Sequence, residues 1–317
     1  MGRTLPRTVV VHEAPGAGRL AAAIEERLPD IRVGTLQPDD LEPTDLDDVR
    51  VLVTFEPPRD LGVPEVSPRW IHALTAGVDG YDIGGLRERG VVLTNASGVG
   101  AEPVAEQVLG YLLTFERRLH RAVRQQVEGE WDWFGGRELR DETVGIVGVG
   151  AIGGRVAELL DAVGAETLGL SRHPASMHPA VDEAYGTGDL TTLLERSDYV
   201  VLTCPLTDET RGLVGASELA RMRDHAVLVN VGRGGLVDQD ALVAALREGT
   251  IRGAALDVFE REPLPTDSPL WERSDVVLTP HNAGSTPNYW RRNADLFARN
   301  YRRFVAGDLD DLVNRVV

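Results

Sequence analysis

The chain has no lysine and a single cysteine among its 317 residues, so all 33 of its basic side chains are arginine. The lone Cys204 excludes an internal disulfide and a zinc site built from cysteines. Aromatic residues make up only 5% of the chain, and no apolar run approaches the ~18 residues needed to span a bilayer. Residues 1–6 lack the apolar stretch of a secretory signal. These absences predict a soluble, cytoplasmic protein without a transmembrane helix or a metal site.

Positive charge is also scarce, because the 50 acidic residues outnumber the 33 basic ones and give the chain a formal charge of −17. Such a chain repels nucleic acid and anionic lipid, so we expect neither as a partner. A GC-rich genome that replaces lysine codons is one explanation of this bias. The other is a surface adapted to a salt-rich cytoplasm, where ions screen the repulsion between charges. The acidic excess and the missing lysine together favour the halophilic surface.

Short apolar, β-branched runs alternate with helical patterns along the chain, which is typical of α/β architecture. At about 150 residues per domain, the length suggests two domains. A first set of expected strands lies at 8–11, 31–33, 49–55, 70–74 and 91–94, with a helix at 20–28. A second set of six lies at 143–147, 167–171, 199–203, 226–230, 253–258 and 276–279. Six such strands separated by helices predict a doubly wound parallel sheet.

Two longer helical patterns frame this second set. The apolar periodicity of residues 102–128 predicts one long helix that links the domains or forms an interface. A final helix is expected at about 287–306, after the sixth strand. It can return to the first domain and would then make that domain discontinuous.

A glycine-rich turn follows the strand at 143–147 and opens a helix. Gly148 permits a tight turn, Gly150 lets a pyrophosphate approach the backbone, and Gly153 lets helix and strand pack closely. The helix N-terminus adds free amides and the positive end of a dipole. This context predicts a dinucleotide site whose cofactor-binding residues are Gly148, Gly150, Ala151, Ile152 and Gly153.

The end of the next strand predicts which dinucleotide binds. A carboxylate there would hold the adenosine ribose of NAD, but this strand ends in Ser171 and Arg172. A hydroxyl followed by a guanidinium suits a 2′-phosphate, which a carboxylate would repel. The sequence therefore favours NADP(H), with NAD(H) as the alternative cofactor.

Three polar segments, 230–234, 257–263 and 279–285, each follow a predicted strand of the second set. Doubly wound sheets place their ligands at this strand edge. Together the segments supply an arginine, a glutamate and a histidine.

With these motifs the chain resembles the D-isomer-specific 2-hydroxyacid dehydrogenases, which include phosphoglycerate dehydrogenase and glyoxylate/hydroxypyruvate reductase. Further matching segments are Ala76-Gly77-Val78-Asp79, Val104-Ala105-Glu106, Cys204-Pro205-Leu206-Thr207 and Thr210-Arg211-Gly212. The resemblance implies two doubly wound α/β domains. A Rossmann coenzyme domain at 99–285 would be inserted in a flavodoxin-like substrate domain formed by 1–98 and 286–317. It also implies a homodimer.

The resemblance places Arg233, Glu262 and His281 at the catalytic positions and the amides of Gly77 and Val78 at the substrate carboxylate. The chemistry fits, since His281 can give a proton to the ketone oxygen and Glu262 favours its imidazolium form. Arg233 would hold the substrate carboxylate and polarise the ketone. Asp257 would orient the nicotinamide, and domain closure would exclude water. The remaining cofactor-binding residues implied are Cys204, Pro205, Thr210, Val231, Gly232, Asp257, Ala283 and Gly284.

The leading interpretation is an enzyme that reduces small 2-oxo acids to D-2-hydroxy acids, with NADPH preferred. An NAD-dependent phosphoglycerate dehydrogenase is the alternative within enzymes, and a dinucleotide-sensing corepressor is an alternative of another class. Loops of the first domain, among them 55–58, would set substrate size, and no motif there identifies the side chain that is accepted. Trp131 and Trp133 would either pack in the core or form part of the dimer interface.

Overall fold

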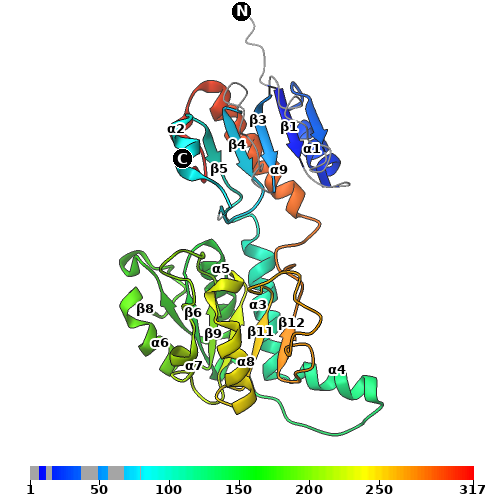
Figure 1. The fold of residues 1–317 in the computed structure, drawn as a ribbon, viewed down its shortest axis with the longest axis vertical. Coiled ribbons are helices and arrows are strands. Elements are labelled where there is room, and N and C mark those ends of the chain that lie inside the picture. The colour runs from blue at the N-terminus through cyan, green and yellow to red at the C-terminus, as the bar shows by residue number, and fades with distance from the viewer. Residues whose placement is uncertain (1–6, 12–15, 37–48, 56–67, 79) are drawn as a thin grey trace, which may run out of the picture. The chain divides into compact units, whose positions relative to one another are not determined.

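The computed structural model describes residues 7–11, 16–36, 49–55, 68–78 and 80–317. The chain divides into two compact units, one formed by residues 1–100 with 286–317 and the other by 101–285. The sequence predicted domain boundaries after residues 98 and 285. Each unit has its own parallel sheet (Figure 1). Among the residues that are described, no helix is long and apolar enough to cross a membrane.

The smaller unit is built on a five-stranded sheet in the order β2-β1-β3-β4-β5, which is the flavodoxin-like order. Its second strand begins later than predicted, because the Ile31 amide donates to the Leu28 carbonyl (3.1 Å) and closes a turn after the first helix. The strands are β1 (Arg7–Val11), β2 (Val33–Leu36), β3 (Val49–Thr54), β4 (Trp70–Ala73) and β5 (Val92–Thr94).

Helices cover both faces of this sheet, and the last helix of the chain is one of them. Leu20 and Phe297, from helices far apart in the sequence, pack in one core cluster with Trp70 of the sheet. Leu86 packs in a second cluster, with Leu52 and other side chains of the sheet. The helices are α1 (Gly16–Arg27), α2 (Ile83–Glu88) and α9 (Tyr289–Ala306).

The larger unit has seven parallel strands in the order β12-β11-β10-β9-β6-β7-β8, the doubly wound order of a Rossmann fold. Six of them lie within one or two residues of the predicted positions. The edge strand β8 (Glu183–Tyr185) escaped prediction because it is short and none of its side chains is buried. The other strands are β6 (Thr143–Val147), β7 (Glu166–Leu170), β9 (Tyr199–Leu202), β10 (Val227–Asn230), β11 (Gly253–Leu256) and β12 (Val276–Leu278).

The prediction of one helix over 102–128 is wrong. The structure has two helices, α3 (Ala101–Glu116) and α4 (Leu119–Glu128), because Arg118 adopts a left-handed conformation with φ 52°. α3 packs against the sheet, whereas α4 buries none of its residues and projects from the unit (Figure 1). The apolar periodicity of the sequence thus continues across the point where one helix ends and the next begins. The unit's other α-helices are α5 (Ala151–Val163), α6 (Leu190–Arg196), α7 (Ala216–Leu219) and α8 (Gln239–Glu248).

Candidate active site

The glycine turn connects β6 to α5, and each of its three glycines has a distinct geometry. Gly148 has φ 100°, and a Cβ there would lie 2.6 Å from the Cys204 backbone. A Cβ on Gly153 would lie 2.4 Å from the Gly148 carbonyl oxygen, so this glycine lets helix and strand meet. A Cβ on Gly150 would meet nothing within 4 Å. The open side of Gly150 is where a bound group can approach the backbone.

The amino end of α5 suits an anionic ligand. Ala151, Ile152 and Gly153 form its first turn, whose amides have no acceptor inside the helix. Their partial positive charge attracts phosphate oxygens. The residues present at this turn therefore fit a dinucleotide.

The residues expected at the adenosine ribose follow β7. The Ser171 amide donates to the Tyr185 carbonyl (3.1 Å), and its hydroxyl accepts from the His173 amide (3.2 Å). Arg172 is exposed. The Thr207 hydroxyl, 2.7 Å away, lowers the pKa of Glu209, and the charge of Arg172 contributes more weakly. Sequence reasoning missed this carboxylate, because Glu209 follows β9 and approaches Arg172 only in the fold.

The loop after β9 holds Cys204, Pro205 and Thr210. Cys204 is only 9% exposed, and burial raises the pKa of its thiol to about 11, which argues against a nucleophile. The Thr210 hydroxyl donates to the Pro205 carbonyl (2.7 Å) and accepts from the Thr207 amide (2.8 Å). Thr210 therefore shapes the loop with its side chain.

His281 and Glu262 come together at the carboxyl edge of the sheet, beyond the ends of β12 and β11. The His281 Nδ1 lies 2.7 Å from a Glu262 carboxylate oxygen. The other oxygen of Glu262 accepts from the Phe259 amide (3.0 Å), which fixes the carboxylate. His281 has φ 50°, a left-handed conformation that few side chains adopt. With Nδ1 engaged, Nε2 is the ring nitrogen left to exchange a proton with a ligand.

Asp257 organises the turn that carries His281. This buried carboxylate accepts from the Thr279 hydroxyl (2.5 Å) and from the amides of Asn282 (3.0 Å) and Ala283 (3.0 Å). One lone pair remains on the oxygen that Ala283 contacts, enough for one carboxamide N–H. Sequence reasoning missed these partners of Asp257, because they come together only in the fold. The Thr279 hydroxyl also forms a hydrogen bond with the Tyr111 hydroxyl of α3.

Arg233 follows β10 in a loop fixed by a buried amide side chain. Asn230 donates to the Arg233 carbonyl (2.9 Å) and accepts from the Gly232 amide (3.1 Å). Arg233 Nη1 donates to the Gly232 carbonyl (2.8 Å). A Cβ on Gly234 would lie 1.9 Å from the Phe259 carbonyl carbon, so only glycine lets this loop pack against the loop that leads to Glu262. Val231 is buried within the same loop.

Gly284 completes the segment after β12. A Cβ there would lie 3.9 Å from the Val104 side chain of α3, an ordinary contact. The glycine turn, Arg233, Asp257, Glu262 and His281 thus all follow carboxyl ends of strands within one unit.

Gly77 and Val78 lie in the smaller unit, in the turn that follows β4, and their neighbour Asp79 lies outside the described residues. The carbonyl oxygens of this turn accept hydrogen bonds from side chains. The Thr75 hydroxyl donates to the Gly77 carbonyl (2.7 Å), and Asn95 donates to the Ala76 carbonyl (2.7 Å). Among the described residues, the amides of Gly77 and Val78 find no acceptor. Paired carbonyls and free amides make this turn a place for an anion. Sequence reasoning missed Thr75 and Asn95. Residues 56–58, which the sequence pointed to for substrate size, also lie outside the described residues.

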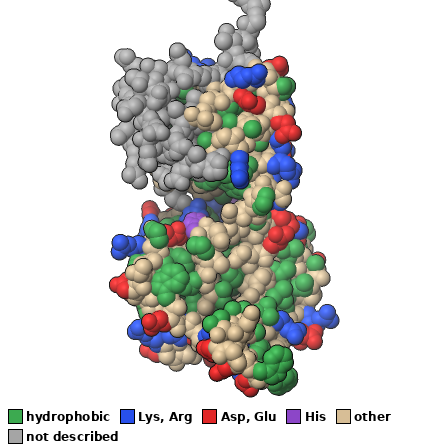
Figure 2. All heavy atoms as spheres, turned by 90° about the vertical axis from the view of Figure 1, so that its right-hand side faces the viewer, with side chains coloured by type: hydrophobic (Ala, Val, Ile, Leu, Met, Phe, Trp, Pro, Cys, Tyr) green, Lys and Arg blue, Asp and Glu red, His purple; other side chains and the backbone are tan. Residues whose placement is uncertain are grey.

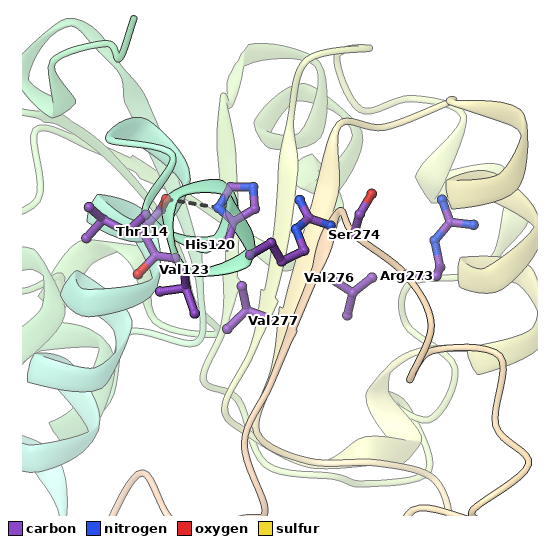
Figure 3. A pocket seen from close by; sticks show the side chains of 9 residues that line it. Thr114, His120, Val123, Arg273, Ser274, Val276 and Val277 are labelled. Carbon is purple, nitrogen blue, oxygen red and sulfur yellow. Dashed lines mark hydrogen bonds between the residues drawn. The ribbon is translucent and has the colours of Figure 1, made fainter. Parts of the chain in front are cut away.

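Two described histidines away from this edge, His178 and His120, have structural partners. In the described part of the chain, no three His, Cys, Asp or Glu residues are grouped so that they could hold a metal. His178 lies 3.3 Å from Glu158 on α5. His120 donates from Nδ1 to the Thr114 carbonyl (3.1 Å) beside a cavity of about 360 Å³ (Figure 3). This cavity lies where β12 begins, at the opposite edge of the sheet from His281.

Comparison with known proteins agrees with this geometry. Residues 109–283 match the NAD-binding domain of the D-isomer specific 2-hydroxyacid dehydrogenases. Glyoxylate/hydroxypyruvate reductase B of Pectobacterium carotovorum is 39% identical over 221 residues, 67% of this chain and 68% of that one. D-3-phosphoglycerate dehydrogenase of Methanocaldococcus jannaschii is 36% identical over 244 residues, which are 75% of this chain and 46% of that protein.

A solved structure resembles the whole chain. It is a D-isomer specific 2-hydroxyacid dehydrogenase from Xanthobacter autotrophicus Py2, in complex with NADPH and MES. It is 33% identical, with a TM-score of 0.84 over 98% of both chains. The sheet order, the glycine turn and these matches lead to one conclusion: the chain belongs to the D-isomer specific 2-hydroxyacid dehydrogenase family of oxidoreductases.

Proposed function

We propose that this enzyme reduces small 2-oxo acids to D-2-hydroxy acids, with NADPH as the preferred cofactor. The observation that carries the proposal is the 2.7 Å His281–Glu262 pair, which lies at the same sheet edge as the glycine turn. A histidine held by a carboxylate can exchange a proton near neutral pH.

His281 protonates the ketone oxygen from Nε2, while Glu262 holds the ring through Nδ1 and stabilises its positive charge. Arg233 offers a guanidinium to the carboxylate and the ketone oxygen of the substrate. The bound cofactor supplies the hydride that reduces C2. Asp257 keeps His281 in place through the amides of Asn282 and Ala283. In the smaller unit, the amides of Gly77 and Val78, which find no acceptor among the described residues, are the proposed partners of the substrate carboxylate.

The test of the proposal follows NADPH and NADH oxidation at 340 nm with glyoxylate, hydroxypyruvate, 3-phosphohydroxypyruvate, pyruvate and longer 2-oxo acids. Turnover that is fastest with NADPH supports the reaction and the cofactor. A NADH-specific reaction overturns the cofactor preference and favours the phosphoglycerate dehydrogenase alternative if 3-phosphohydroxypyruvate is the best substrate. Tight cofactor binding without turnover of any acid favours the dinucleotide-sensing alternative.

Arg172 is the proposed ligand of the 2′-phosphate of NADPH. Arg172→Ala should weaken NADPH binding at least about tenfold more than NADH binding, because charge-assisted hydrogen bonds to phosphate each contribute about 1.5–3 kcal/mol. Fluorescence titration of both cofactors gives the two Kd values. Arg247→Ala, which changes another arginine at the end of α8, is the control. An equal loss of affinity for both cofactors would show that Arg172 does not read the 2′-phosphate.

We also propose that two copies pair through α4 and the segment after it. Leu119, Val123 and Val127 recur every four residues on α4 and are 48%, 59% and 83% exposed, and Trp131 and Trp133 are 102% and 87% exposed. Core packing of the two tryptophans is therefore wrong. Figure 2 looks onto the side from which α4 projects and shows hydrophobic side chains in the open among charged ones. An uncovered apolar face of this kind favours a protein partner.

The oligomer is tested by light scattering after gel filtration. The protein should elute with twice the mass of one chain. Val123→Asp should shift it toward a single chain, because an unpaired carboxylate inside an apolar interface is costly. Val163→Asp, at an exposed position on α5, is the control and should leave the mass unchanged. A single-chain mass for the unmodified protein would refute the proposal.

A further inference from the structure

We propose that Tyr111 of α3 is a positioning residue for the nicotinamide ring. Through the Thr279 hydroxyl it fixes the Asp257 carboxylate, so that one defined oxygen is left for the carboxamide of the cofactor. The inference rests on the proposed function, with Asp257 as the acceptor for the carboxamide. None of the motifs that mark the family resemblance contains Tyr111, and its hydroxyl meets this site only in the fold.

Tyr111 is a buried side chain of the larger unit, and it carries a polar group into the core. It is 3% exposed and packs in one cluster with Val108 of α3 and Ala255 of β11. A buried hydroxyl is costly unless it is hydrogen-bonded, whereas a leucine would fill the same place without a partner. The Tyr111 hydroxyl finds its partner in the Thr279 hydroxyl, 168 positions away, just after β12.

The number of protons available gives this contact a direction. The Thr279 hydroxyl donates its one proton to Asp257 (2.5 Å), because a carboxylate can only accept. The Thr279 oxygen therefore accepts from Tyr111, and the Tyr111 oxygen accepts in turn from the side-chain amide of Gln107, four residues earlier on α3. All three hydrogen bonds point toward the carboxylate, and bonds aligned in this way strengthen one another.

Tyr111 remains a donor at neutral pH. Burial raises the pKa of its phenol, and the hydrogen bonds with Thr279 and Gln107 offset this only in part. An unperturbed tyrosine already titrates near pH 10, so the phenol keeps its proton. With that proton directed at the Thr279 oxygen, the Thr279 proton stays on Asp257.

The two oxygens of Asp257 are thereby made unequal. The oxygen that accepts from Thr279 also accepts from the Asn282 amide (3.0 Å), which uses both of its lone pairs. The other oxygen accepts from the Ala283 amide (3.0 Å) and keeps one lone pair. A carboxamide N–H is directed to this second oxygen. Without the Tyr111 hydroxyl, the bond from Thr279 weakens and the first oxygen competes for the same N–H.

The experiment measures binding by isothermal titration calorimetry with two ligands, NADPH and its 3-acetylpyridine analogue. In the analogue a methyl ketone replaces the carboxamide, so it offers no N–H to Asp257. Tyr111→Phe removes only the hydroxyl and should raise the Kd of NADPH about three- to tenfold, the effect of one neutral hydrogen bond. The Kd of the analogue should change less than about twofold, since a net hydrogen bond contributes little where none is made.

Thr279→Val interrupts the chain of hydrogen bonds at its middle. It should raise the Kd of NADPH at least as much as Tyr111→Phe does. The double variant should match Thr279→Val alone, because two residues that act through one another are not additive.

Two further variants complete the set. Gln107→Leu changes a half-buried side chain and should raise the Kd of NADPH in the same direction but less, since it removes only the bond farthest from Asp257. The matched control is Tyr301→Phe on α9 of the smaller unit. This tyrosine is 3% exposed, and its hydroxyl finds no partner among the described residues. Its loss should leave both Kd values unchanged.

Two outcomes would overturn the inference. An equal loss of affinity for NADPH and for the analogue would show that Tyr111 supports the fold and not the carboxamide. Additive effects of Tyr111→Phe and Thr279→Val would show that Tyr111 does not act through Thr279. Matching melting temperatures of the variants exclude misfolding as the cause.

The test is independent of turnover. It is therefore distinct from failure of the proposed function, in which the protein binds cofactor and reduces no 2-oxo acid. NADPH and NADH carry the same carboxamide, so NADH and its 3-acetylpyridine analogue serve equally if NADH is the preferred cofactor.

Discussion

Replacing His281 by alanine is expected to lower kcat about 10²–10⁴-fold, because general acid catalysis contributes this much to enzymatic rates. The Glu262 carboxylate, 2.7 Å from Nδ1, would lose the cation it stabilises. Affinity for NADPH should change little, since the glycine turn precedes α5 and has no hydrogen bond to His281. Single-turnover rates and fluorescence titration of NADPH measure the two effects separately.

A second variant guards against a purely structural effect. His281 has φ 50°, which alanine adopts poorly and asparagine adopts well. His281→Asn therefore keeps the turn but removes the titratable ring, and it should lose as much activity as His281→Ala. His225→Ala changes a half-exposed histidine paired with Asp198 and should leave kcat intact. Activity that survives in His281→Asn would remove His281 from the mechanism.

Replacing Arg252 by alanine is expected to destabilise the larger unit by about 3–5 kcal/mol, because the change leaves a buried carboxylate with only a more distant cation, Arg137, whose Nε lies 3.8 Å away. Arg252 Nη2 lies 2.9 Å from a Glu116 oxygen and 2.6 Å from the Tyr199 hydroxyl. The Glu116 carboxyl group is fully buried, and it also accepts from Tyr199. Burial and the nearby Glu116 charge raise the pKa of Glu142 in the same region.

Urea unfolding followed by circular dichroism measures this loss. Arg221→Ala removes an exposed arginine 3.2 Å from Glu195 and should cost only about 0–1 kcal/mol. The double variant Arg252→Met, Glu116→Leu removes both charges and should recover most of the stability, since apolar replacements of buried pairs are often neutral. A loss below about 1 kcal/mol in Arg252→Ala would show that Arg137 or water compensates the Glu116 charge in the folded protein.

Much of the larger unit was readable from the sequence, because its signals are local. The strand, the three glycines and the helix that follows are contiguous in the chain, and Gly148 has the positive φ that the tight turn requires. The apolar runs of the five predicted strands other than β12 are largely buried, so composition alone marks them. The strand β8 was not predicted, because an exposed edge strand needs no apolar run.

The residues proposed for catalysis could be selected from the sequence for a different reason. Arg233, Glu262 and His281 stand in short motifs that resemble those of a known family, and each follows a predicted strand. The 2.7 Å pairing of His281 with Glu262, 19 positions apart, is a property of the fold. The same holds for the Tyr111–Thr279–Asp257 chain behind it, which joins α3 to the ends of two strands.

By itself the sequence determined the family and the α/β fold in outline, and it suggested the residues proposed for hydride-transfer chemistry, since these depend on local pattern. Only the tertiary structure decided where α3 ends, that the amides of Gly77 and Val78 find no acceptor among the described residues, and that Phe55 meets Tyr289. It also buried Glu116 against Arg252, 136 positions away. The reason is that burial, pairing and free hydrogen-bond groups depend on contacts between distant segments, which no local pattern records.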